Sequence, residues 1–313
     1  MEKPKYMDVK RLLASSPANI SSWFSLLEET LKTKKISQDL ILNIDETGIS
    51  LCKSDNNHII TDSDQKQSVL HSQQHEPNAT LIFGVYTDGS SLNPLMLWPS
   101  KTVPKDLLPL KFRNVEIITN GSGWITKTDY EEIMMQYILP AIDKKRIELH
   151  GKEATALIIM DGHSSRLCWP VMSWCCTHSI EIAILPSHST HLTQPLDRYV
   201  FARFKKSLYS SFKPPTESGV SASRKALIPA LADAVSAALD PRTIRKSSYA
   251  CGIEPFDPSV VLDRLPNQLS IAKTSSLTSS CTFSEIMNKK VITSDEFVEE
   301  NDTHEEGLYN LNG

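Results

Sequence analysis

Two short apolar segments, each running into an aspartate, constrain the fold of this chain more than any other feature. Residues 40–44 lead into Asp45 and residues 156–160 lead into Asp161, and a glycine follows each aspartate within three positions. Apolar runs of this length that end in turn-forming residues are typical of buried strands. Ligands of open α/β sheets bind at the carboxyl ends of the strands. Two such strands side by side would therefore place both carboxylates at one edge of the core.

A third aspartate, Asp197, follows Asp161 by 36 positions and lies at the start of an expected helix. Three carboxylates that converge would make a site for Mg²⁺ or Mn²⁺, the ions that commonly serve phosphoryl transfer. A single aspartate after a strand is more often a turn residue or a helix cap. Three of them in matching settings favour the metal site.

Hydrophobic periodicity predicts a mixed α/β fold, a sheet with helices on both faces. Residues 53–78 are expected to be a loop or a weak hairpin and residues 99–111 a loop, and Thr128 with Glu131 is expected to form a capping box. From about Pro266 the chain turns polar, and the residues after position 280 include eight acidic and two basic ones, which predicts a disordered acidic C-terminal tail. The expected strands are residues 40–44, 80–86, 95–98, 156–160 and 180–185, and the expected helices are 18–32, 128–142, 167–178, 196–212 and 224–239.

Composition narrows the class of protein. The 313 residues suffice for one large core or two small ones, and no apolar run approaches the ~20 residues that span a bilayer. Six cysteines without paired spacing indicate reduced thiols, as in cytosolic or nuclear proteins. The net charge of −4 is unevenly distributed, since residues 198–246 hold ten Lys and Arg against three Asp and Glu. This basic block is either a surface for a phosphate backbone or a solvated helix face.

Four longer motifs resemble one family when taken together and in order. They are residues 43–48 (Asn-Ile-Asp-Glu-Thr-Gly), 123–124 (Gly-Trp), 160–165 (Met-Asp-Gly-His-Ser-Ser) and 185–197 (Leu-Pro-Ser-His-Ser-Thr-His-Leu-Thr-Gln-Pro-Leu-Asp). Over residues 20–260 the chain resembles the DDE superfamily endonuclease domain of pogo, Tigger and jerky-type transposases. Residues 251–258 (Cys-Gly-Ile-Glu-Pro-Phe-Asp-Pro) resemble the segment that closes that domain.

The resemblance implies an RNase H-like fold for residues 20–260, with residues 1–19 as an N-terminal extension and residues 261–313 as the tail. It also implies two-metal, magnesium- or manganese-dependent nicking of DNA and strand transfer. Asp45, Asp161 and Asp197 match the catalytic, metal-binding aspartates of the family. DNA is the implied partner, the nucleus the implied location, and a homodimer a candidate assembly.

Other residues of these motifs are expected to support the site. His163, His188, His191 and Gln194 would surround the aspartates, since no Cys or His has zinc-ligand spacing to the histidines. Lys205 and Lys206 are expected to contact DNA phosphates. Arg166 stands where the family pattern has a histidine. It either faces outward to grip DNA or pairs with an aspartate and competes with the metal. We favour the outward orientation, in which Arg166→His weakens DNA binding and leaves metal affinity unchanged.

Two functions of different classes follow. The first is an active DNA endonuclease of the transposase type. The second is a catalytically inactive, transposase-derived nuclear module that binds DNA or protein. Transposases of this type carry an N-terminal helix-turn-helix region, and about twenty residues precede the resemblance here, fewer than three helices require. We therefore expect a fragment, a truncated relict or a domesticated derivative.

Overall fold

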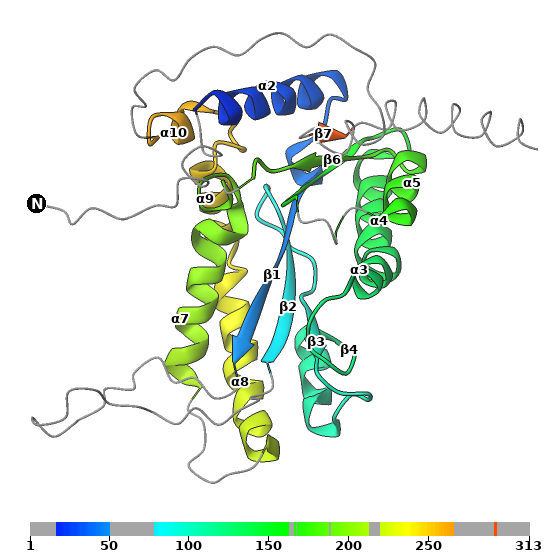
Figure 1. Ribbon diagram of the computed structural model, residues 1–313, viewed down its shortest axis with the longest axis vertical. Helices are drawn as coiled ribbons and strands as arrows, with labels where there is room; N and C mark the ends of the chain where they lie inside the picture. Colours follow the sequence, from blue (N-terminus) through cyan, green and yellow to red (C-terminus); the bar gives the residue numbers. More distant parts are fainter. Residues whose placement is uncertain are drawn as a thin grey trace, which may run out of the picture.

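A seven-stranded mixed sheet forms the centre of the protein, with strand order β4-β3-β2-β1-β5-β6-β7 (Figure 1). The computed structural model describes residues 17–50, 78–162, 166, 168–187, 189–212, 220–265 and 291–292. The predicted mixed α/β fold is confirmed. The strands are β1 (Ile41–Ser50), β2 (Asn78–Tyr86), β3 (Leu95–Trp98), β4 (Glu116–Thr119), β5 (Ala156–Met160), β6 (Ile180–Ile184) and β7 (Val291–Ile292).

Helices cover both faces of this sheet (Figure 1). One face packs through Phe83 and its neighbours against α7 and α8, and the other packs through Ile82 and Ile158 against α3–α5. The α-helices are α2 (Pro17–Thr33), α3 (Lys127–Ile133), α4 (Leu139–His150), α5 (Trp169–Thr177), α6 (Thr190–Thr193), α7 (Phe201–Ser211), α8 (Val220–Ala238), α9 (Pro241–Ala250) and α10 (Ser259–Leu262). Shorter helical segments of other types are η1 (Gln38–Leu40), η2 (Lys105–Arg113), η3 (Met134–Ile138) and η5 (Leu196–Val200).

Strand β1 sets the geometry of the site. It runs parallel to β5, with Asn43 opposite Ile159, and antiparallel to β2, with Asp45 opposite Phe83. Side chains alternate between the two faces of a strand. Leu42 and Ile44 pack on the side of α3–α5, so Asn43 and Asp45 lie on the opposite face, where α7 packs. The expectation that two aspartate-bearing strands lie side by side is confirmed.

Some local predictions were wrong. The capping box is formed by Thr126 and Asp129 rather than by Thr128 and Glu131. Helix α3 begins at Lys127, and the Asp129 carboxylate accepts a hydrogen bond from the Thr126 amide at 2.9 Å. Part of the expected loop at 99–111 belongs to η2, and the sequence pattern missed β4, α9, α10 and β7. Val291–Ile292 pairs with β6 inside the segment expected to be disordered. The remainder of that tail and residues 53–77 of the other expected loop lie outside the described residues.

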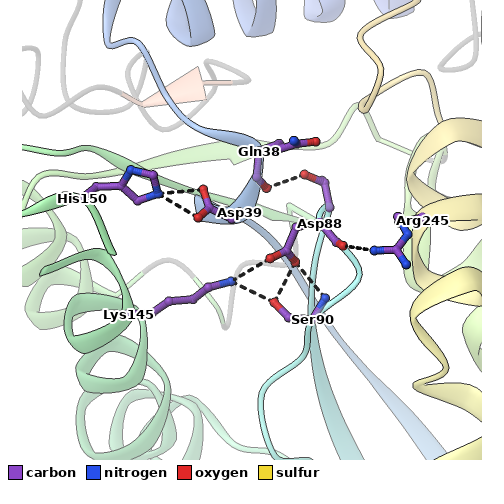
Figure 2. A network of polar contacts seen from close by, with 8 residues as sticks. Gln38, Asp39, Asp88, Ser90, Lys145, His150 and Arg245 are labelled. Carbon is purple, nitrogen blue, oxygen red and sulfur yellow. Dashed lines mark hydrogen bonds and ion pairs between the residues drawn. The ribbon is translucent and has the colours of Figure 1, made fainter. Parts of the chain in front are cut away.

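A polar network links the segment just before β1 to the turn after β2. Figure 2 shows His150 of α4 facing Asp39, with 2.8 Å between Nε2 and Oδ2, and Lys145 facing Asp88 across 3.4 Å. Arg245 of α9 donates to the Asp88 carbonyl at 2.5 Å. Gly89 turns the chain here with a φ of +96°, a conformation that favours glycine. The network therefore joins α4 and α9, which cover opposite faces of the sheet, through the turn after β2.

Candidate active site

The three predicted aspartates come from three separate elements. Asp45 lies within β1, Asp161 directly follows β5, and Asp197 lies in the first turn of η5. Asp45 and Asp161 each stand two positions beyond the last pair, Asn43 and Ile159, in the parallel register of β1 and β5. The parallel pairing of β1 with β5 thus brings the first two aspartates together, as the spacing predicted. The expected end of the first strand at residue 44 was wrong, because pairing with β2 continues β1 to Ser50 and leaves Asp45 inside the strand.

Asn43 joins the three segments, and the sequence reasoning assigned it no role. Its side-chain amide donates to the Ile159 carbonyl at 2.9 Å, and its Oδ1 accepts the Leu196 amide at 3.0 Å. Asn43 lies two residues before Asp45, Ile159 two before Asp161, and Leu196 immediately before Asp197. With 1% of its surface exposed, Asn43 has no water to replace these bonds. A polar residue inside an apolar strand was the available signal.

Arg166 points into the aspartate cluster. Its Nη2 lies 3.1 Å from Asp45 Oδ1 and 2.5 Å from Glu46 Oε2, and its Nη1 pairs with Asp161. The residue is 6% exposed. The expected outward orientation is therefore wrong, because three carboxylates from β1 and β5 offer the guanidinium stronger partners than solvent does. The expectation for Arg166→His reverses accordingly, toward a higher affinity for divalent cations.

Burial and mutual repulsion set the charge state of Asp45. Burial raises the pKa of Asp45 to about 8, Arg166 opposes this rise, and the negative charges of Glu46, Asp197 and Asp161 add to it. For Arg166, burial disfavours the charged form, but the carboxylates of Glu46, Asp161 and Asp45 outweigh burial and raise its pKa. The charges of both other aspartates therefore affect the pKa of Asp45.

Asp197 faces a different set of groups. Burial raises its pKa, with a further contribution from Asp161, while a hydrogen bond from Thr190 and the positive charges of Lys205 and His191 act in the opposite direction. Lys205, two helical turns further along, thus lies close enough to Asp197 to affect its charge. Arg198 also fixes the start of η5, since its Nη1 donates to the His191 carbonyl at 3.0 Å.

The remaining predicted residues fall into three groups. Lys206 is exposed on α7 and lies in a groove away from the aspartates. Gln194 is 1% exposed and is a buried part of the turn between α6 and η5. His163 and His188 lie outside the described residues.

The aspartates match a divalent cation in donor chemistry. Carboxylate oxygens are the ligands that Mg²⁺ and Mn²⁺ take in proteins. Among the described residues, however, no group of three or more acidic, His or Cys side chains is placed to hold a metal ion. Arg166 occupies the space between Asp45 and Asp161. The aspartates therefore offer the type of ligand atom that a divalent cation needs, but a cation could bind only if Arg166 moved away from Asp45 and Asp161.

Comparison with known proteins identifies a family for part of the chain. Residues 77–220 match the DDE superfamily endonuclease family. Asp161 and Asp197 lie inside this match, and Asp45 precedes it. The MFS-type transporter clz9 of Cochliobolus lunatus is 23% identical over 240 residues, covering 73% of this chain. The chain spans about 25% of the length of that relative. Within the described residues, no helix has the length and apolar character needed to cross a membrane.

Solved structures with a similar fold come from the Mos1 mariner transposase. The pre-cleavage Mos1 transpososome gives a TM-score of 0.52 at 14% identity, covering 86% of this chain and 67% of that chain. The Mos1 catalytic domain with Raltegravir and Mg gives 0.51 at 13% identity, covering 85% and 100%. These similarities confirm the predicted RNase H-like fold.

Proposed function

We propose that this chain, which contains a DDE superfamily endonuclease domain of the transposase type, cleaves phosphodiester bonds of DNA. One observation carries the proposal: Asn43 ties together the three backbone segments that bear Asp45, Asp161 and Asp197. Precise placement of carboxylates from distant segments is the protein's main task in metal-assisted phosphoryl transfer. A network that served stability alone would not need an aspartate beside each of its three anchor points.

In this proposal Asp45, Asp161 and Asp197 hold two Mg²⁺ or Mn²⁺ ions, and Arg166 leaves the carboxylates when they bind. Such ions, when held by these carboxylates, would supply activation of a water molecule and stabilisation of the leaving oxygen. The chain itself orients the three carboxylates, through the paired strands β1 and β5 and the first turn of η5. Lys205, near Asp197, is placed to contact a phosphate of the bound strand.

Strand transfer, location and assembly belong to the same proposal. Related folds occur in a Mos1 strand transfer complex and in a Mos1 paired end complex with Mn. The similarity in fold to these Mos1 complexes supports our proposal that DNA is the substrate, that divalent ions are the cofactors and that strand transfer is a second step. We further propose a pogo- or Tigger-like relationship, action in the nucleus and a homodimeric assembly.

Nicking of supercoiled plasmid DNA by the purified protein tests the proposal. We expect nicked circles with Mg²⁺ or Mn²⁺ and none with EDTA. Asp161→Asn and Asp197→Asn should abolish nicking. Asp263→Asn removes an exposed carboxylate beyond α10 and should leave nicking unchanged. Metal-independent nicking, or nicking that survives both site substitutions, would contradict the proposed chemistry.

A second function is favoured by the ion pairs of Arg166. A guanidinium shared by Asp45, Glu46 and Asp161 offsets part of the negative charge of the cluster without a metal. The same fold would then act as a catalytically inactive module that binds DNA or protein. DNA binding by the wild-type protein, without nicking by either the wild type or Arg166→His, would favour this second function.

A further inference from the structure

We propose that a basic groove between α7 and α9 holds the phosphate backbone of a DNA duplex, an inference that rests on the proposed function. The groove has a volume of about 540 Å³. Its cationic residues are Arg203 and Lys206 from α7 and Lys246 from α9, and Tyr199 and Thr243 also line it. Three of the basic residues found between positions 198 and 246 therefore lie in one groove.

The packing of the helices fixes the side chains of this groove. Arg203 Nη1 donates to Thr243 Oγ1 at 3.0 Å, which links α7 to the first turn of α9. Lys246 Nζ lies 4.7 Å from the centre of the Tyr199 ring, within the range of a cation–π contact. At its other side α9 is held by Arg245 through the Asp88 carbonyl. The two helices that supply the charges therefore keep their relative positions.

The positive charges of the groove remain available to a ligand. No ion pair among the described residues involves Arg203, Lys206 or Lys246. The described residues that line the groove include no carboxylate. An adjoining hollow of about 650 Å³ shares Arg203 and Lys246 and also includes Asp233, Asp240 and Arg242. Asp233 has an interaction partner of its own. The Asp240 carboxylate is already engaged, since it accepts the Thr243 amide at 3.2 Å. An anion is thus the chemically matched occupant.

The arrangement favours a polymer of phosphates over a single small anion. Arg203 and Lys206 are three residues apart and share one face of α7, while Lys246 approaches from a second helix. Lys205 lies on a neighbouring face and affects the charge of Asp197. Helix α7, which directly follows η5, therefore carries cations toward both the aspartates and the groove. A duplex seated in the groove would lie along α7, the helix that follows the segment bearing Asp197.

Duplex binding in EDTA tests the groove separately from cleavage. We compare the double variant Lys206→Gln/Lys246→Gln with Lys144→Gln/Lys152→Gln, which removes two exposed charges on and after α4. Fluorescence anisotropy with a short labelled duplex gives affinity across a salt series. Each phosphate contact adds about 0.9 to the slope of log affinity against log salt, so the groove variant should lose about 1.8. The α4 variant should keep the wild-type slope, and both should keep the wild-type melting temperature.

Three outcomes would overturn the inference. If the wild type binds the duplex and both variants lose affinity equally, the groove proposal fails while DNA binding stands. If the wild type binds no duplex at low salt, the proposed function fails with it. If polyglutamate displaces the duplex as well as unlabelled DNA does at equal charge, the groove serves an acidic polypeptide instead.

Discussion

Replacing Arg166 by glutamine should destabilise the protein in the absence of divalent ions. Removing one partner of a buried ion pair costs about 3–5 kcal/mol, because a charge is left without compensation. The side chain of Asp45 is 11% exposed, whereas those of Glu46 and Asp161 are 30% and 28% exposed. The partly solvated carboxylates reduce the penalty, so we expect a loss of about 3 kcal/mol. For a domain of this size that loss lowers the melting temperature by about 6–12 °C.

Divalent cations should reverse most of this loss. In the wild type a cation must displace the guanidinium from Asp45 and Asp161, whereas Arg166→Gln leaves both carboxylates free. We expect the variant to bind Mn²⁺ at least about tenfold more tightly, which corresponds to about 1.4 kcal/mol. A cation at a hundred times its dissociation constant stabilises the folded state by about 2.7 kcal/mol. Thermal unfolding in a Mn²⁺ titration, without DNA, measures both quantities.

Arg146 provides the matched control. It is a second buried arginine, 4% exposed, and pairs with Asp143 at 2.5 Å. It lies against the Ala154 carbonyl just before β5, whereas Asp161 follows the other end of that strand. Arg146→Gln should also lower the melting temperature, but its response to Mn²⁺ should equal that of the wild type. If Arg166→Gln and the wild type show the same Mn²⁺-dependent shift, Arg166 does not compete with the cation and our reasoning is wrong.

Three further predictions concern β1, which carries Asp45, and its partner strand β2. Asn43→Leu leaves a buried carbonyl and a buried amide unpaired, at about 1–3 kcal/mol each. It should abolish the Mn²⁺-dependent rise in melting temperature, whereas Thr80→Val, which loses one buried bond of 2.8 Å to Gly123, should retain that rise. The folded state favours protonated Asp45, since burial raises its pKa from 3.8 to about 8; this stability is present below the unfolded value and is lost as pH rises through the folded value. The free energy of unfolding of Asp45→Asn, relative to that of the wild type, should therefore increase as the pH is raised from about 5 to about 9. Urea unfolding without divalent ions measures this difference, and a difference that does not change with pH would contradict the assignment. Phe83→Ala should cost about 3–5 kcal/mol, because Phe83 is fully buried with its ring 5.7 Å and 5.2 Å from those of Phe201 and Phe204; a loss below about 1 kcal/mol would show that the core refills the space.

The sequence by itself determined the two strands of the site and the resemblance to a family that residues 77–220 match. Apolar runs that end in Asp45 and Asp161 predicted two strands, and the structure pairs them side by side. Strand periodicity and turn residues are local properties, so short windows of sequence suffice to find them. The motifs around the aspartates identified the DDE superfamily and the RNase H-like fold, both of which the comparisons confirm.

Only the tertiary structure decided how the side chains between these elements pair. The partners of Arg166 include a carboxylate 121 residues away, and Asn43 reaches segments 116 and 153 residues away. Periodicity carries no information about contacts at such separations. The inward orientation of Arg166 was missed because a turn at the end of a strand usually faces solvent. Here the guanidinium turns inward toward carboxylates that come together only when β1 and β5 pair. Burial of Asn43 and the raised pKa of Asp45 follow from the same assembly.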